Sequence, residues 1–184
     1  MSIRIAKEYA GLSREALLAK AWELGYNFAE NSASCSQSVV AALHELLGFE
    51  AVLVKAATSL RSGTAGQYLG TCGALAGGVI VLDYYSGRPL EQMSCRERIQ
   101  SNVDALKPAL EAPKLLAERF IGKYGNILCP HVERQLFGRS FYGADPDEAK
   151  KKKAAQERTA PQNCSGIVGD VSRWVMEILT RPKD

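Results

Sequence analysis

The last part of the chain carries the clearest helical pattern of apolar positions. Apolar residues recur there at steps of three and four, namely Ile167, Val168, Val171, Trp174, Val175, Ile178 and Leu179. The charged residues Asp170, Arg173 and Glu177 lie between them. Because an α-helix turns once in about 3.6 residues, this spacing produces one apolar face and one polar face. We therefore predict a helix that packs on one side only.

Two segments near the N-terminus show the same spacing. One consists of Leu17, Leu18, Ala21, Trp22 and Phe28, and the other of Val39, Val40, Leu43, Leu46 and Leu47. The second segment is followed by Gly48, a residue type that commonly ends helices. We predict a helix in each of them.

The middle of the chain is expected to be helical but interrupted. From Arg96 to Ile121 the apolar spacing fits two helical pieces, with Pro108 and Pro113 at the points where a helix must restart or bend. The apolar stretch from Ala74 to Leu82 has no hairpin partner and no alternation of period two. We predict a buried helix for this stretch.

A glycine-rich segment at residues 62–73 separates these helices. It contains four glycines, which suits a tight loop whose backbone comes close to its surroundings. It has neither the Gly-Lys-Ser/Thr ending of a phosphate loop nor the glycine spacing of a dinucleotide-binding turn. A structural turn is therefore favoured over a nucleotide site.

These elements predict a mainly α-helical protein, a single-domain bundle of several helices. With 184 residues, of which 46% are hydrophobic, the chain can bury one substantial core. We treat residues 1–184 as one helical domain, with a core from about residue 13 to about residue 180. The charged stretch 145–162, which includes Lys150 to Lys153, is expected to be a linker or a solvated surface helix.

Charge and hydropathy exclude several classes of partner. The 23 basic and 20 acidic residues give a net charge of +3, too small and scattered to predict nucleic-acid binding. The first residues lack the apolar core of an export signal, and no stretch approaches 18 consecutive apolar residues. We expect a cytoplasmic protein without a membrane span.

The chain contains five cysteines, and in a reducing compartment such residues more often serve metal or redox chemistry than disulfide staples. Each lies near a predicted helix start. Cys35 follows Ser34, which with Gln37 has the spacing of a capping box. Cys72 and Cys164 follow the N-cap candidates Thr71 and Asn163, and Cys129 precedes Pro130 and is expected to be the cap itself. Ser94 and Glu97 place Cys95 in a similar way.

A helix N-terminus stabilises negative charge, so we expect these positions to lower the pKa of the thiols. Thiolates are the form that attacks disulfides and binds metals. Four of them meeting in space would suit an iron–sulfur cluster or zinc. The gaps between the cysteines are long, and no Cys-x-x-Cys pair is present to specify the kind of centre.

The cysteine contexts resemble the C_GCAxxG_C_C family of four-cysteine redox-active proteins. The central motif here reads Cys72-Gly73-Ala74-Leu75-Ala76-Gly77, with Cys35 upstream and Cys129 and Cys164 downstream. The match extends roughly from Leu17 to Leu179 and leaves Cys95 outside. The resemblance implies a helical domain whose four cysteines act in redox chemistry, as ligands of an iron–sulfur or other metal centre. Gly73 and Gly77 would let the backbone approach that centre, although helix packing explains them equally well.

Two histidines are weaker candidates. His131 lies two residues after Cys129 and could join a metal shell, but such a residue is more often a polar group at a helix start. His44 lacks the second histidine of a zinc-protease helix and is expected at the surface.

Three functions remain open. The first is electron transfer through a centre bound by the four cysteines, with a redox partner that the sequence does not identify. The second is metal-free thiol–disulfide exchange, with Cys35 and Cys72 as the first pair. The third is a non-catalytic helical module with structural zinc. Whether the chain is an enzyme, and whether it forms a homodimer, stay open. Each function in which the four cysteines form one common site predicts that their sulfurs gather at one end of the bundle.

Overall fold

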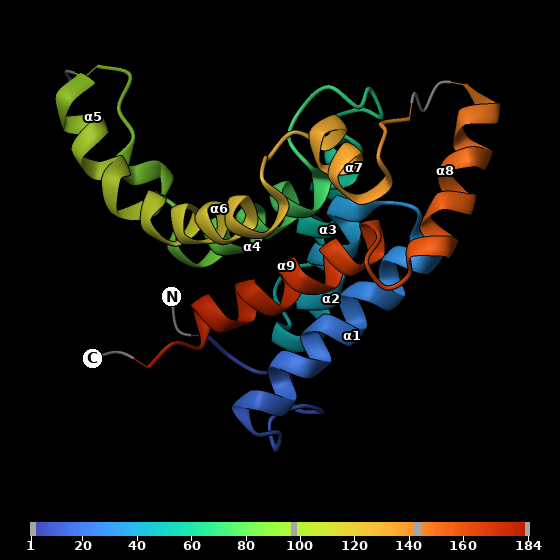
Figure 1. Ribbon diagram of the computed structural model, residues 1–184. Coiled ribbons are helices and arrows are strands. Elements are labelled where there is room, and N and C mark those ends of the chain that lie inside the picture. The colour runs from blue at the N-terminus through green and yellow to red at the C-terminus, as the bar shows by residue number, and fades with distance from the viewer. Residues whose placement is uncertain (1–2, 97–98, 142–144, 183–184) are drawn as a thin grey trace.

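We describe the protein from a computed structural model, for residues 3–96, 99–141 and 145–182. In this part of the chain the secondary structure is helical, apart from one isolated antiparallel bridge between Thr71 and Leu128 (Figure 1). The α-helices are α1 (Arg14–Ser32), α2 (Cys35–Leu47), α3 (Val52–Ala56), α4 (Gly73–Ser86), α5 (Ile99–Leu106), α6 (Glu111–Tyr124), α7 (Cys129–Phe137), α8 (Pro146–Thr159) and α9 (Cys164–Leu179). Short 3₁₀ turns are η1 (Thr58–Leu60), η2 (Leu90–Gln92) and η3 (Lys107–Leu110). The expected mainly α fold is confirmed.

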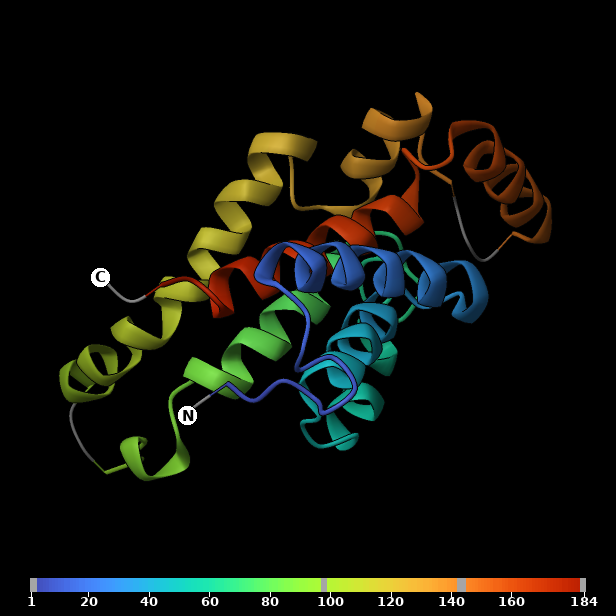
Figure 2. The same ribbon diagram turned by 90° about the horizontal axis from the view of Figure 1, so that it is seen from below.

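Helices α1 and α9 form the centre of the bundle and lie side by side over much of their length (Figure 2). Both were predicted from apolar periodicity, and the predicted face of α9 is buried, including Val168, Val171 and Val175. The two helices approach closely because α1 has a glycine at the contact. A Cβ atom at Gly25 would lie 2.5 Å from Ser172 Oγ of α9.

Helices α2 and α4 pack on this pair and complete the core. Helix α4 contacts α2, α6 and α9, and its apolar residues Val81 and Leu82 have no exposed surface. The predicted buried helix is therefore confirmed. Burial on several sides explains why the sequence here shows neither a helical polar face nor strand alternation. Gly48 ends α2 in the left-handed conformation, as predicted, with φ of 65°.

The predicted interruption between α5 and α6 is also present. Pro108 lies in the 3₁₀ turn η3, which separates the two helices. Pro113 does not break the chain, because it lies in the first turn of α6, where the missing N–H has no intrahelical partner to lose. Figures 1 and 2 both show α5 at one end of the molecule and α8 at the other.

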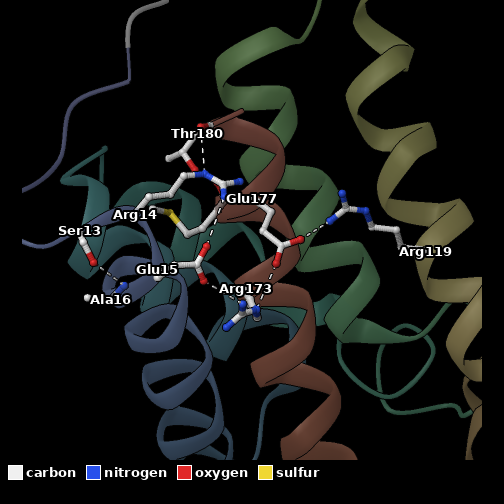
Figure 3. Close-up of polar contacts among 9 residues, drawn as sticks. Ser13, Arg14, Glu15, Ala16, Arg119, Arg173, Glu177 and Thr180 are labelled. Carbon is white, nitrogen blue, oxygen red and sulfur yellow. Dashed lines mark hydrogen bonds and ion pairs between the residues drawn. The ribbon is translucent and has the colours of Figure 1, made fainter. Parts of the chain in front are cut away.

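Ion pairs link α1, α6 and α9 near the C-terminal end of α9 (Figure 3). Glu177 accepts hydrogen bonds from Arg119, at 2.5 Å, and from Arg173, at 3.1 Å. Arg173 also lies 3.7 Å from Glu15 of α1. Such solvent-exposed pairs contribute little individually, about 0 to 1 kcal/mol. This network lies at the end of α9 opposite Cys164.

No helix in the described part of the chain is long and apolar enough to cross a membrane.

Candidate functional site

The four cysteines of the matched pattern line one cavity of about 240 Å³. Cys35, Cys129 and Cys164 are the first residues of α2, α7 and α9, and Cys72 is the residue that caps α4. The structure therefore brings together four positions that are widely separated in the sequence. Cys95 is exposed and does not border this cavity. We call this space the cysteine cavity.

The bridge between Thr71 and Leu128 places two of the cysteines next to each other in the fold. The Cys72 N–H donates to Ile127 O at 2.7 Å, and the Cys129 N–H donates to Gly70 O at 2.9 Å. The chain thus enters α4 and α7 from two paired segments. The sequence offered no pattern for this bridge, because a pairing of single residues leaves no periodicity.

The bridge also corrects two predicted helix caps. Thr71 does not cap α4, because its backbone is paired with Leu128, and Cys72 is the cap residue instead. Cys129 is not the cap of α7, which is Leu128, whose backbone is extended. Each cysteine is still at the helix start, but one position away from the place that was predicted.

The caps beside the other two cysteines had opposite outcomes. Asn163 Oδ1 accepts a hydrogen bond from the Gly166 N–H at 3.0 Å, so the predicted cap of α9 is confirmed. The capping box of Ser34 and Gln37 is not formed. Gln37 Nε2 donates to Thr58 Oγ1 at 3.0 Å instead, and the Ser34 side chain makes no cap bond. The predicted box of Ser94 and Glu97 falls partly outside the described residues.

The glycine-rich segment forms one wall of the cysteine cavity through Ser62 and Tyr68, and Arg61, which precedes the segment, extends this wall. It is the predicted tight loop, but glycine is not its only left-handed residue type. Residues with positive φ include Ser62 at 49° and Tyr68 at 59°, and also Thr64 and Ala65. Non-glycine residues adopt this conformation rarely, and such residues concentrate at functional sites. The sequence alone did not indicate this feature.

Gly73 and Gly77 of α4 allow different atoms of α2 to lie close to the helix backbone. A Cβ atom at Gly73 would lie 2.4 Å from Cys35 Sγ, so this glycine makes room for a sulfur of the site. A Cβ atom at Gly77 would lie 2.5 Å from the backbone oxygen of Ser36. Gly77 therefore lets α4 pack against the first turn of α2, and its place next to a bound group stays a prediction.

Helix α8 contributes a buried ion pair that the sequence did not indicate. Lys152 bonds to Glu133 of α7, and their side chains are only 14% and 1% exposed. The Lys152 ammonium also lies 4.5 Å from the centre of the Tyr68 ring. The expectation of a solvated lysine run is therefore wrong for Lys152. Glu133 and Tyr68 are distant from Lys152 along the chain. The residues beside Lys152 in the sequence are other lysines, which indicate only a charged surface.

Three of the cavity thiols have raised pKa values, contrary to the prediction from their positions at helix starts. Burial raises the pKa of Cys129 to about 12 and that of Cys164 to about 11, and it raises the pKa of Cys72 as well. The lysine at position 152 lowers the pKa of Cys164 but does not outweigh burial. The predicted lowering of thiol pKa is wrong for these three residues, because the loss of hydration exceeds the favourable field of the helix end.

These raised pKa values predict that the metal-free, reduced protein loses stability in alkali. The unfolded chain ionises its thiols from about pH 8.5, whereas the folded protein keeps the Cys164 proton up to about pH 11. Above pH 8.5 the unfolded state thus binds fewer protons, so the free energy of unfolding falls as pH rises, until the folded pKa is passed. Urea unfolding between pH 8 and pH 11 measures this fall.

The variant Cys164→Ser provides the control, because serine does not titrate in this range. Its free energy of unfolding should fall less steeply than that of the natural chain, because it lacks the buried Cys164 thiol. Parallel curves for the two proteins would contradict the assignment.

The two histidines do not border the cysteine cavity. His131 lies on the first turn of α7 and is exposed. His44 is half-buried rather than fully at the surface, since its Nδ1 lies 2.6 Å from Phe49 O near the end of α2. Its ring therefore serves the junction after α2.

Comparison with known proteins gives one match. The model of a family described as "Putative redox-active protein (C_GCAxxG_C_C)" matches residues 33–178, which include all four cysteines of the cavity. No curated protein matches the chain. No solved structure matches it either.

Proposed function

Because the chain belongs to the C_GCAxxG_C_C family of redox-active proteins, we propose that Cys35, Cys72, Cys129 and Cys164 bind an iron–sulfur or related metal centre in the cysteine cavity. The observation that carries this proposal is the common cavity itself. Four helix starts from separate parts of the chain each contribute a cysteine to it. Unrelated core cysteines would have no reason to share both a cavity and this position in their helices.

The residues around the cavity fit such a centre in their chemistry. Thiolates are the usual ligands of iron–sulfur clusters, and the walls are partly apolar, with Val132, Ile167 and Val168 among them. Helix N-termini and the ammonium of Lys152 would offset the negative charge of four thiolates. When bound, the centre would supply reversible one-electron transfer. The chain itself would hold it, shield it from water and set the charge around it.

The structural zinc alternative receives less support from the geometry. One tetrahedral zinc ion needs four sulfurs at roughly 2.3 Å from a single point. In the part of the chain that the structure describes, no group of three or more His, Cys, Asp or Glu side chains is already placed to hold a metal ion of any kind. The ligands of a cluster bind different iron atoms and lie farther apart. A multi-atom centre in the cavity of about 240 Å³ would therefore require less convergence of the four sulfurs than a single ion would.

Metal analysis of protein purified without oxygen tests the proposal. We expect iron and acid-labile sulfide in comparable amounts, with a brown colour that is bleached by a reductant such as dithionite. Zinc without sulfide would support the structural alternative. Colourless protein that takes up no iron after anaerobic reconstitution would contradict the proposal.

Thiol–disulfide exchange is a second candidate, favoured by one contact. Cys35 Sγ lies against Gly73, the residue next to Cys72, where α2 and α4 meet. Oxidation would join their sulfurs and release two electrons and two protons to an acceptor. In that case thiol titration of metal-free protein should show a reversible loss of two thiols, and peptide mapping should find them at Cys35 and Cys72.

The proposal requires a partner that donates or accepts electrons, and a reducing compartment that keeps the thiols free. We expect the cytoplasm for this reason. Association of two copies into a homodimer stays open, and sedimentation of the metal-loaded protein would decide it.

A further inference from the structure

More cationic than anionic side chains border the cysteine cavity. Its walls contain three cationic side chains, Arg61, Lys152 and Lys153, and one carboxylate, Glu133. The metal-free cavity therefore has an excess of positive charge on the side formed by α8 and the 61–72 loop.

The carboxylate of Glu133 is fully engaged within the wall. One of its oxygens bonds to Lys152, and the other accepts a hydrogen bond from the Phe141 N–H at 2.9 Å. Glu133 is 1% exposed, so it compensates Lys152 and has little further effect on the opening of the cavity. The positive charges of Arg61 and Lys153 stay uncompensated.

The lysine run on α8 makes this contrast clear. Lys150, Lys151 and Lys152 each have an acidic partner, namely Asp147, Glu148 and Glu133. Lys153 has no ion-pair partner among the described residues, and the same holds for Arg61. The two cations that lack a carboxylate are thus the two exposed ones at the cavity.

An independent observation indicates a missing hydrogen-bond partner at the same place. Ser34 borders the cavity, is only 5% exposed, and its hydroxyl has no hydrogen-bond partner. Buried hydroxyl groups in proteins are nearly always hydrogen-bonded, and an exception commonly marks a bound water or ligand. Ser34 also lacks the capping bond that its position before α2 would normally give it.

We propose that the cysteine cavity contains a second binding site, in which Arg61, Lys153 and the Ser34 hydroxyl bind a small oxyanion beside the cysteines, with Lys152 behind them. Guanidinium, ammonium and hydroxyl donors are the groups that hold phosphate, sulfate and carboxylate in proteins. Binding of the anion is independent of any metal centre.

Isothermal titration of the metal-free, reduced full chain with sodium sulfate tests the site. We expect saturable binding that sodium chloride at equal ionic strength does not reproduce. Lys153→Gln and Arg61→Gln should each weaken sulfate binding by at least about tenfold, the usual effect of a lost charge-assisted hydrogen bond. Both side chains are exposed, so neither change is expected to impair folding. Ser34→Ala should weaken binding by a smaller factor.

Lys150→Gln is the matched control. It removes the same charge from the same helix, but its side chain is 81% exposed, is paired with Asp147 and does not line the cavity. Its sulfate affinity should stay within about twofold of the natural chain. Titrations with phosphate and acetate then identify which oxyanion class binds best. Absence of saturable binding by all three anions, or equal losses for Lys150→Gln and Lys153→Gln, would overturn the proposal.

The two proposals can fail separately. Sulfate binding with this mutational pattern in protein that never takes up iron would leave the anion site intact and remove the metal centre. Iron loading without any oxyanion binding would support the metal centre and contradict the anion site.

Discussion

Replacing any one of the four cavity cysteines by serine is expected to reduce the iron content to background. Serine keeps nearly the same shape but offers a hard oxygen ligand in place of a soft thiolate. Loss of a residue that merely supports a metal ligand typically weakens binding by about 10- to 100-fold, so loss of a ligand should cost more. Iron and sulfide analysis of each anaerobically reconstituted variant measures the effect, with circular dichroism to confirm that the variants fold.

Cys95→Ser is the control for this series, because Cys95 is exposed and lies away from the cavity. Its iron content should equal that of the natural chain. The pattern among the other four separates the two redox proposals. A metal centre needs all of them, whereas a disulfide between Cys35 and Cys72 would survive Cys129→Ser and Cys164→Ser. Full iron content in a serine variant of any cavity cysteine would contradict ligation by that residue.

Gly77→Ala is expected to destabilise the protein by at least about 2 kcal/mol. The new methyl group would lie 2.5 Å from the Ser36 backbone oxygen and 3.2 Å from its Cα, and neither atom can move without the first turn of α2. Any relaxation would also shift Cys35 relative to Cys72. We therefore expect weaker iron binding together with lower stability, measured by urea unfolding and by metal analysis.

Gly122→Ala isolates the effect of the added methyl group. Gly122 also lies within a helix, α6, but a Cβ atom there would meet nothing within 4 Å. Alanine favours helix over glycine, so this variant should be more stable by roughly 0.5 to 1 kcal/mol. A Gly77→Ala protein as stable as the natural chain would show that α4 and α2 are not packed as described.

Apolar periodicity was sufficient to predict the helices that form the core. It placed α1, α2 and α9 because each has one buried and one exposed face, and that asymmetry is visible in the order of residues. The buried helix α4 had to be inferred from the absence of a strand pattern. Local residue preferences placed Cys35, Cys72, Cys129 and Cys164 at helix starts, and the structure confirms these four starts, although only the Asn163 cap forms as predicted.

What could not be predicted depends on contacts between distant segments. Thr71 has the right chemistry for a helix cap, but its backbone is paired with Leu128, 57 positions away. The sequence predicts that Lys152 is one of four solvated lysines, but the fold places it beside Glu133 and Tyr68. The predicted lowering of the thiol pKa values was wrong for the same reason. Burial depends on the assembled fold, whereas the stabilisation of anions at a helix N-terminus is a local effect.

The wide spacing of the cavity cysteines also bears on how the protein is made. Cys35 leaves the ribosome first and Cys164 is synthesised 129 positions later. At about 5 to 20 residues per second, this interval lasts roughly 6 to 26 s. During it the early thiols have no complete site to enter, and any disulfide formed among them would trap an incomplete chain. If the four cysteines bind a metal centre as proposed, that centre would be loaded only once α9 has been synthesised, and chains held at an earlier stage should carry none.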